Sequence, residues 1–190
     1  FSDEVVKRAL DELGGIDILV NNAGASAAMP FESITDEGWM ADIELKLFSA
    51  IRMARLAIPS MRARGGGRII NITTVGGKAP GPNSMPRSVT RAAGLAMTKA
   101  LSKEVAKDGI NVNTVCIGVV RSGQIGRSAA ARFPGMPLED AFKEMGKGVP
   151  VGRIGTPEEA GDLITFLASG RGGFINGASI NFDGGMAPVV

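Results

Sequence analysis

Two arginines are the residues of this sequence best suited to bind a negatively charged group. Arg87 and Arg91 stand four positions apart at the start of a predicted helix, a spacing that places both on one helical face. A guanidinium stays protonated in proteins, so the pair can hold an anion or an oxyanion but is a poor proton donor. The alternative is a solvated helix face, on which the two arginines repel each other mildly.

Other chemistries are excluded by the residues that the sequence lacks. It contains no histidine and one cysteine, which removes the usual transition-metal ligands and every histidine-dependent triad, so we expect no metal site. Cys116 lies in an apolar, strand-like stretch and is interpreted as a small buried hydrophobe. A single cysteine forms no internal disulfide, which favours a reducing, cytoplasmic location. Tyrosine is also absent.

Composition indicates one globular domain that spans residues 1–190. The chain is 44% hydrophobic and 21% charged, and it is long enough for a compact core without disulfides or metals. No apolar run approaches the ~18 residues of a membrane span, so we expect no membrane partner. The net charge of +2 is small and the basic residues are scattered, so we expect no nucleic-acid partner either.

Helical and strand-like patterns alternate along the chain. Helices are predicted at 5–13, at 35–64 with a kink or break near Pro59, at 86–107 with Pro86 as first residue, at 138–145 and at 156–168 with a capping box. Strands are predicted at 16–20, 68–74, 110–116 and 178–182. The rest of 117–155 is expected to be an irregular lid or substrate loop. This alternation implies crossover connections and a mostly parallel sheet.

Five motifs, in this order, resemble those of the short-chain dehydrogenases/reductases. They are DILVNNAG at 17–24, NITTVGG at 71–77, GVVRS at 118–122, GRIGTPEE at 152–159 and DGG at 183–185. The third is similar to the family's nicotinamide loop, although Ile117 replaces the usual preceding proline. The resemblance implies an α/β, Rossmann-type fold, a doubly wound parallel sheet of which this sequence holds the last four strands and their helices.

The resemblance also implies a cofactor, NAD or NADP. In the family, the chain begins with a strand, a glycine-rich turn and a helix that seats the cofactor's pyrophosphate. Phe1 corresponds to a position after the family's first β-α-β-α-β portion, so we expect a longer polypeptide, with an intact mass above 19.6 kDa. The choice between NAD and NADP is made near the family's second strand, which this sequence lacks.

Four positions correspond to the family's catalytic residues. Thr74 stands at the serine that polarises the carbonyl, Arg87 at the tyrosine that donates the proton, and Arg91 at the lysine four residues later. Lys46, thirteen residues before the proline of the long helix, stands at the family's asparagine. Since a guanidinium does not exchange a proton as tyrosine does, the resemblance implies a divergent member with an atypical active site. Arg91 could still bind the cofactor's ribose hydroxyls.

Lys46 is the candidate replacement for the missing proton carrier. Two permanent cations nearby and partial desolvation should both lower its pKa, towards a range useful for acid–base work. The alternative is that Lys46 faces solvent or pairs with a carboxylate such as Glu44. The resemblance implies cofactor contacts from a further set of residues: Asn21, Ala23, Gly24, Arg91, Gly118, Val120 and Ser122.

Three functions remain open. The favoured one is a divergent NAD(P)-dependent oxidoreductase that acts on a carbonyl or alcohol group of a small, anionic substrate, with Lys46, a water or the substrate itself in place of the tyrosine. The second is a non-redox enzyme that uses a cationic pocket for elimination, aldol or dehalogenation chemistry. The third is an inactive protein that binds a nucleotide or a partner. In the family the two long helices form the main subunit interface, which implies a homodimer or homotetramer.

Overall fold

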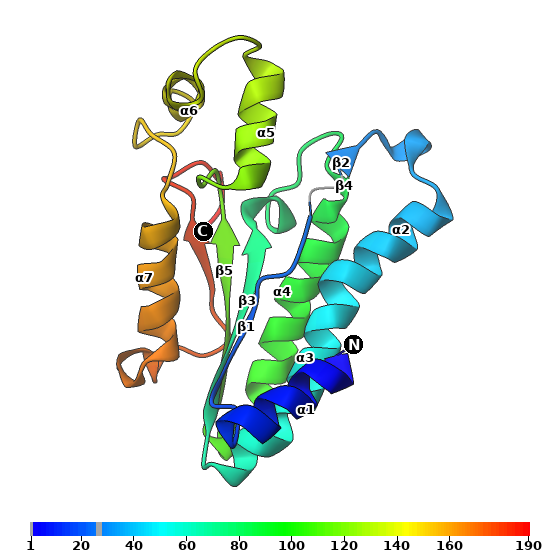
Figure 1. Cartoon of the computed structure of the whole chain (residues 1–190), viewed down its shortest axis with the longest axis vertical. Coiled ribbons are helices and arrows are strands. Elements are labelled where there is room, and N and C mark those ends of the chain that lie inside the picture. The colour runs from blue at the N-terminus through cyan, green and yellow to red at the C-terminus, as the bar shows by residue number, and fades with distance from the viewer. Residues whose placement is uncertain (1, 26–27) are drawn as a thin grey trace.

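The centre of the fold is a four-stranded parallel sheet with the strand order β1-β3-β5-β6 (Figure 1). The computed structural model describes residues 2–25 and 28–190. The strands are β1 (Ile18–Asn21), β3 (Gly67–Thr74), β5 (Ile110–Ile117) and β6 (Ser179–Phe182). Register pairs Asn21 with Asn71, Thr74 with Ile117, and Ile117 with Phe182, so the strands end at one common edge. The predicted α/β class and parallel sheet are confirmed.

Helices cover both faces of this sheet, as a doubly wound fold requires. On one face lie α1 (Ser2–Leu13), α3 (Ser49–Ala63) and α4 (Arg87–Glu104), and on the other lies α7 (Pro157–Ala168) (Figure 1). β1 is an edge strand of this sheet, and its Ile18 and Val20 are half exposed.

An apolar core fixes α3 and α4 against the sheet. Its buried members are Leu19, Ala54, Ala57, Ile58, Met61, Ile69, Val105, Ile110 and Val112. Full burial of one of the leucine, isoleucine, valine or methionine side chains in this core stabilises the fold by roughly 1.5–3 kcal/mol. The packing is close enough that Gly67 must lack a side chain, because a Cβ there would lie 2.5 Å from the sulfur of Met61. This packing fixes α4, which carries Arg87 and Arg91, and α3, which begins three residues after Lys46.

Capping residues set the helix ends largely where the sequence predicts them. Thr156 accepts a hydrogen bond from the backbone N–H of Glu159, whose carboxylate accepts one from the Thr156 N–H, so the predicted capping box is confirmed. Thr35 caps α2 (Asp36–Ile43) as predicted. Gly109, with φ 73°, follows the short turn η4 (Ala106–Asp108) and leads into β5.

The predicted helix 35–64 is in fact three segments. Between α2 and α3 lies a π-helical turn, η2 (Glu44–Phe48), which the sequence pattern did not reveal. A break at Pro59 was the wrong expectation, because α3 continues through that residue to Ala63. The lost backbone hydrogen bond is tolerated because the preceding residues Ala57 and Ile58 are packed in the core.

Two further predictions on element boundaries need correction. The segment 117–155 contains a second helix, α5 (Gly123–Arg132), besides the predicted α6 (Leu138–Gly146). Its start is explained by Ser122, whose hydroxyl accepts from the Ile125 N–H as an N-cap. Pro86 precedes α4 rather than opening it, and α4 ends at Glu104, three residues short of the predicted end. A short antiparallel pair, β2 (Ala28–Met29) with β4 (Met85–Pro86), was also not predicted.

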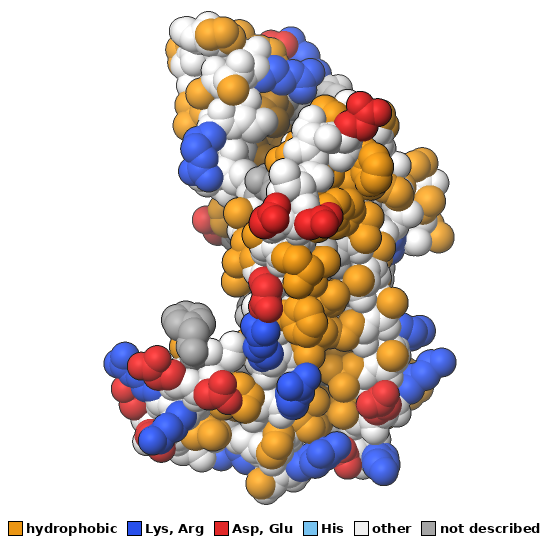
Figure 2. Space-filling view, turned by 90° about the vertical axis from the view of Figure 1, so that its right-hand side faces the viewer, with side chains coloured by type: hydrophobic (Ala, Val, Ile, Leu, Met, Phe, Trp, Pro, Cys, Tyr) orange, Lys and Arg blue, Asp and Glu red, His pale blue; other side chains and the backbone are white. Residues whose placement is uncertain are grey.

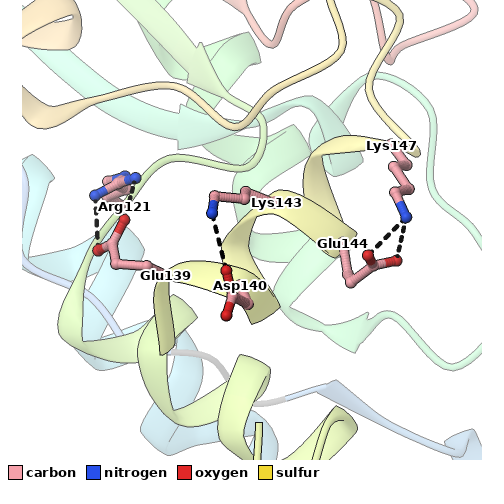
Figure 3. A network of polar contacts seen from close by, with 6 residues as sticks. All are labelled: Arg121, Glu139, Asp140, Lys143, Glu144 and Lys147. Atoms are coloured by element: carbon pink, nitrogen blue, oxygen red, sulfur yellow. Dashed lines mark hydrogen bonds and ion pairs between the residues drawn. The ribbon is translucent and has the colours of Figure 1, made fainter. Parts of the chain in front are cut away.

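Ion pairs tie α6 to the loop that follows β5. Figure 3 shows the guanidinium of Arg121 facing Glu139, with two hydrogen bonds of 3.0 and 2.8 Å. The same view shows two pairs within α6 itself, Lys143 with Asp140 and Lys147 with Glu144. Exposed pairs of this kind contribute about 0–1 kcal/mol each, and only the pair of Arg121 with Glu139 joins α6 to another segment.

Within residues 2–25 and 28–190, no helix is both long and apolar enough to cross a bilayer.

Candidate active site

The predicted catalytic and cofactor residues gather at the carboxyl edge of the sheet. Asn21 ends β1, Thr74 ends β3 and Gly118 directly follows β5. Arg87 is the first residue of α4, which begins beside the same edge (Figure 1). In open parallel sheets ligands bind just beyond the carboxyl ends of the strands, so the topology places these residues where a binding site is expected.

Lys46 lies in the π-helical turn and is buried, with 1% of its side chain exposed. Its ammonium donates a hydrogen bond to the carboxylate of Asp42, one turn earlier. The alternative of a solvated Lys46 is wrong, whereas the alternative that Lys46 pairs with a carboxylate is confirmed, with Asp42 as the partner. Glu44, the carboxylate named for that pairing, is exposed and accepts from Arg52 at 2.6 Å. Single π-turns within helices occur frequently at functional sites, and this one contains Lys46.

The environment of Lys46 lowers the pKa of its ammonium, as the sequence predicted. Loss of hydration on burial is the largest cause and lowers the pKa of the Lys46 ammonium below its usual value. The negative charge of Asp42 opposes this change in pKa, while Arg91 and Arg87 reinforce it. The lysine is therefore both charge-paired and easier to deprotonate than an exposed lysine.

Asp42 connects the turn of Lys46 to α4. Its second carboxylate oxygen accepts a hydrogen bond of 2.6 Å from the hydroxyl of Thr90, and both residues are buried. Neither residue was identified from the sequence. The i, i+4 spacing of Asp42 and Lys46 was the available signal, but such pairs are common on exposed helix faces. Only the burial of this pair distinguishes it from them.

Arg91 lies between the loop after β1 and the end of β3. Its Nη1 donates to the carbonyl oxygen of Ile72 at 2.9 Å, and its Nη2 lies so close to Gly24 that a Cβ there would be 2.6 Å away. The Nε of Arg91 is buried and has no hydrogen-bond partner among the described residues. Burial lowers the pKa of Arg91, but a guanidinium remains a cation in any case.

Arg87 and Arg91 are half-buried, so the alternative of a solvated helix face is wrong. Both cations act electrostatically on Lys46. The hydroxyl of Thr74 is buried and has no hydrogen-bond partner in the described part of the chain. Three cations, one carboxylate and one unpartnered hydroxyl therefore lie beside this edge of the sheet.

A cavity of about 240 Å³ brings four of the predicted residues together: Asn21, Ala23, Lys46 and Arg91. Its apolar wall includes Leu47, Ala50, Met53 and Met97. The loop after β5 does not reach this cavity. Val120 instead pairs with Gly155, and Ser122 uses its hydroxyl to cap α5.

A chain of buried polar side chains fixes Asn21. Its amide donates to the Asn71 side-chain oxygen at 2.8 Å, and the Asn71 amide donates in turn to Thr98 at 2.9 Å. Thr98 also accepts from Thr114 at 2.8 Å. These bonds join β1, β3, α4 and β5, so the residue predicted to contact the cofactor is held by structure on three other elements.

The described residues contain no cluster of three potential metal ligands from histidine, cysteine, aspartate and glutamate.

Comparison with known proteins identifies the family of this fold. The family model described as "Enoyl-(Acyl carrier protein) reductase" matches residues 2–187. An acetoacetyl-CoA reductase of Rhizobium meliloti (strain 1021) is 37% identical over 95% of this chain and 72% of that protein. A D-beta-hydroxybutyrate dehydrogenase of Cupriavidus necator is 33% identical over 96% of this chain and 72% of that protein.

Solved structures agree with these relatives. The L-sorbose reductase from Gluconobacter frateurii, complexed with NADPH and L-sorbose, superimposes with a TM-score of 0.94 at 33% identity, over 100% of this chain and 73% of that one. The chain belongs to the short-chain dehydrogenase/reductase family, as its five motifs predicted.

Proposed function

We propose that the protein is a divergent NAD(P)-dependent oxidoreductase that interconverts a carbonyl and an alcohol group, with Lys46 as its proton carrier. The observation that supports this proposal is the buried ammonium of Lys46 in the wall of the cavity that Asn21, Ala23 and Arg91 also line. Relatives of this chain are named as reductases and dehydrogenases, which supports the reaction class.

The residues present fit a nicotinamide cofactor. The buried Nε of Arg91 and the hydroxyl of Thr74 have no protein partner in the described part of the chain, and both suit the polar groups of a ligand. Gly24, without a Cβ, leaves the guanidinium of Arg91 room beside the loop after β1. Asn21, Ala23, Gly24 and Arg91 would hold the nicotinamide ribose. When bound, this group supplies the two-electron chemistry of carbonyl–alcohol interconversion.

Lys46 holds the proton that such a reaction needs. Its lowered pKa lets the Nζ atom give a proton to a developing alkoxide, or take one from an alcohol, closer to neutral pH than an exposed lysine. Arg87 and Arg91 stay cationic and stabilise negative charge on the substrate oxygen, which an oxyanion site does by electrostatics alone. Thr74 donates the hydrogen bond that polarises the carbonyl.

The excess of positive charge favours an anionic substrate. Among the charged groups that act on Lys46 in the described part of the chain, Arg87 and Arg91 are cations and Asp42 is the one carboxylate. The names of the relatives do not decide the matter, because they include an L-sorbose reductase as well as a hydroxybutyrate dehydrogenase. A carboxylate or phosphate near the reacting carbon would bind the arginines through charge-assisted hydrogen bonds.

The first test is binding of NADH and NADPH, followed by a panel of carbonyl and alcohol substrates read at the nicotinamide absorbance. Each acid is paired with its neutral amide, and we expect a kcat/KM at least 10-fold higher for the acid. Equal values for acid and amide would contradict the anionic preference, and binding without turnover on the whole panel would contradict the reaction class.

Lys46→Met tests the proton step. We expect loss of turnover with little change in nucleotide affinity, because the variant removes the proton carrier and leaves Arg91 in place. Lys143→Met, which removes an exposed lysine of α6, is the matched control and should keep parental turnover. Unchanged turnover in Lys46→Met would refute the role of Lys46.

The ion pair with Asp42 favours the second candidate, a non-redox enzyme that uses the cationic pocket. A lysine held by a carboxylate releases its proton less easily, while the arginines remain able to stabilise an oxyanion. This candidate predicts that Lys46→Met keeps anion binding and that no nicotinamide-linked absorbance change occurs with any substrate.

For the assembly we propose a homodimer or homotetramer formed through α3 and α4. A groove between these helices is lined by Ile51, Ala54, Arg55, Ile58, Met97, Ala100, Leu101 and Glu104. Figure 2 shows apolar side chains gathered in a band along this side of the molecule. Light scattering with size-exclusion chromatography should give a multiple of the chain mass, and Ala100→Glu should lower it. A single-chain mass for the parent would contradict the assembly.

A further inference from the structure

Asp42 has no role in the proposed reaction, although it and Lys46 are the two charged residues most deeply buried in the described part of the chain. A buried carboxylate is costly unless its oxygens are paired. Here each oxygen has one partner, Lys46 on Oδ1 and Thr90 on Oδ2. Both oxygens of this buried carboxylate are therefore paired.

The two partners of Asp42 lie on different elements. Lys46 belongs to the π-helical turn η2, whereas Thr90 belongs to α4 and stands between the two arginines in sequence. The Thr90 hydroxyl also lies 3.0 Å from the carbonyl oxygen of Arg87, in the same first turn of α4. One carboxylate therefore connects the candidate proton carrier to the turn that holds both anion-binding arginines.

We propose that Asp42 is a positioning residue: it holds Lys46 in the cavity wall and locks the first turns of α4, with Arg87 and Arg91, to the same carboxylate. This inference rests on the proposed function, since it assigns the group that acts through Lys46. It adds a residue that neither the family's motifs nor the sequence pattern identified.

The electrostatics give Asp42 a second effect, on the protonation of Lys46. The charged groups that face Lys46 are Asp42 from its own helical segment and Arg87 and Arg91 from α4. Asp42 is the one negative charge among them, and it raises the pKa of Lys46 against the effect of burial and of both arginines. Removal of this charge lowers the pKa of Lys46, because an opposite charge at hydrogen-bond distance shifts a pKa by about 1–3 units.

Asp42→Asn is the central test, because asparagine keeps the shape and can still accept from Thr90 while it loses the charge. In cofactor-free protein labelled with ¹³C-lysine, we expect the Lys46 resonance, assigned by its loss in Lys46→Met, to titrate about 1–3 pH units lower than in the parent. The alkaline limb of the kcat/KM profile for carbonyl reduction, which needs protonated Lys46, should move by the same amount. A folded Asp42→Asn variant with an unmoved titration overturns the proposal.

Two further variants separate position from charge. Thr90→Val removes the hydrogen bond to α4 but not the charge, so we expect a higher KM for the substrate with an unmoved Lys46 titration. Glu44→Gln is the matched control, an exposed acid in the same π-helical turn, and should change neither. A Thr90→Val variant with parental KM overturns the connection to the arginines.

The test remains decisive if Asp42→Asn does not fold. Asp42→Glu keeps the charge and displaces it by one methylene, so we expect lower kcat and a Lys46 titration shifted by less than one unit; parental values of both would overturn the proposal. Failure of the proposal about Asp42 is distinguishable from failure of the proposed function. If Lys46→Met keeps turnover, the proton step is wrong; if that variant is inactive and Asp42→Asn leaves the titration unmoved, only the role of Asp42 is wrong.

Discussion

Gly24→Ala tests how Arg91 is seated beside the loop after β1. A Cβ at position 24 would lie 2.6 Å from Nη2 of Arg91, whereas ordinary contacts begin at 3.4 Å. The guanidinium must therefore withdraw by about 0.8 Å. Its Nη1 is held by the 2.9 Å hydrogen bond to Ile72, which the movement strains or breaks. The nearest contact from another side chain is ordinary, since Cγ of Lys46 lies 3.9 Å from the added carbon.

The size of the effect follows from this hydrogen bond. A hydrogen bond to a charged group contributes about 1.5–3 kcal/mol, which sets the upper limit because the contacting atom is the end of a flexible side chain. Since 1.4 kcal/mol corresponds to a factor of 10, we expect NAD(P)H binding to weaken by about 10-fold and by at most about 100-fold. Thermal stability should change little, because alanine also reduces the freedom of the unfolded chain.

Isothermal titration of the nucleotide into a double-mutant cycle measures the effect. In the Arg91→Ala background the added methyl group meets no guanidinium, so Gly24→Ala should then cost almost nothing. Gly161→Ala is the matched control: its Cβ meets no atom within 4 Å in α7, and it should raise the melting temperature without affecting binding. Parental affinity in Gly24→Ala, or an equal loss in both backgrounds, would refute the reasoning.

Three further predictions concern stability. Hydrogen bonds from Arg153 and then from the Thr156 backbone lower the pKa of Glu159 from 4.5 to about 2, so its carboxylate stabilises the fold above pH 4.5 and this contribution is lost as the pH falls towards 2. Glu159→Gln should therefore melt at a lower temperature at pH 7, with the two melting curves converging near pH 2; a constant difference would contradict this. Met61→Ala should reduce the free energy of unfolding in urea by about 2–5 kcal/mol, because the fully buried side chain leaves a cavity, and a loss below 1 kcal/mol would show that the core collapses around it. Asn71→Ala, which removes the buried amide between β1 and α4, should cost about 1–3 kcal/mol in the same assay; parental stability would show that water replaces the amide.

Patterns confined to neighbouring residues were predictable because their physics is local. The capping box at Thr156 and the N-cap at Thr35 follow from side chains that reach the backbone three residues on. The break expected near Pro59 does not occur, because packing by distant residues outweighs the missing N–H. The helix at 123–132 was not predicted, because this segment was interpreted as a loop and Ser122 was not recognised as an N-cap.

The candidate site was predicted in its positions but not in its contacts. Motif spacing identified Lys46, Arg87 and Arg91, and the structure brings their charges together as expected. It did not identify Asp42, because the sequence alone does not distinguish a buried i, i+4 pair from an exposed one. The same limit applies to Val120 and Ser122, which contact Gly155 and Ile125 and do not line the cavity.

The sequence by itself determined the alternation of strands and helices, the family, and the absence of tyrosine and histidine from residues 1–190. Hydrophobic periodicity, turn residues and motif order are enough for this, since each depends on residues near one another in the chain. Only the tertiary structure decided which charges meet. The π-helical turn at 44–48 and the packing of α4 bury Lys46, Asp42 and Thr90 together, and burial distinguishes this ion pair from an ordinary one on an exposed helix face.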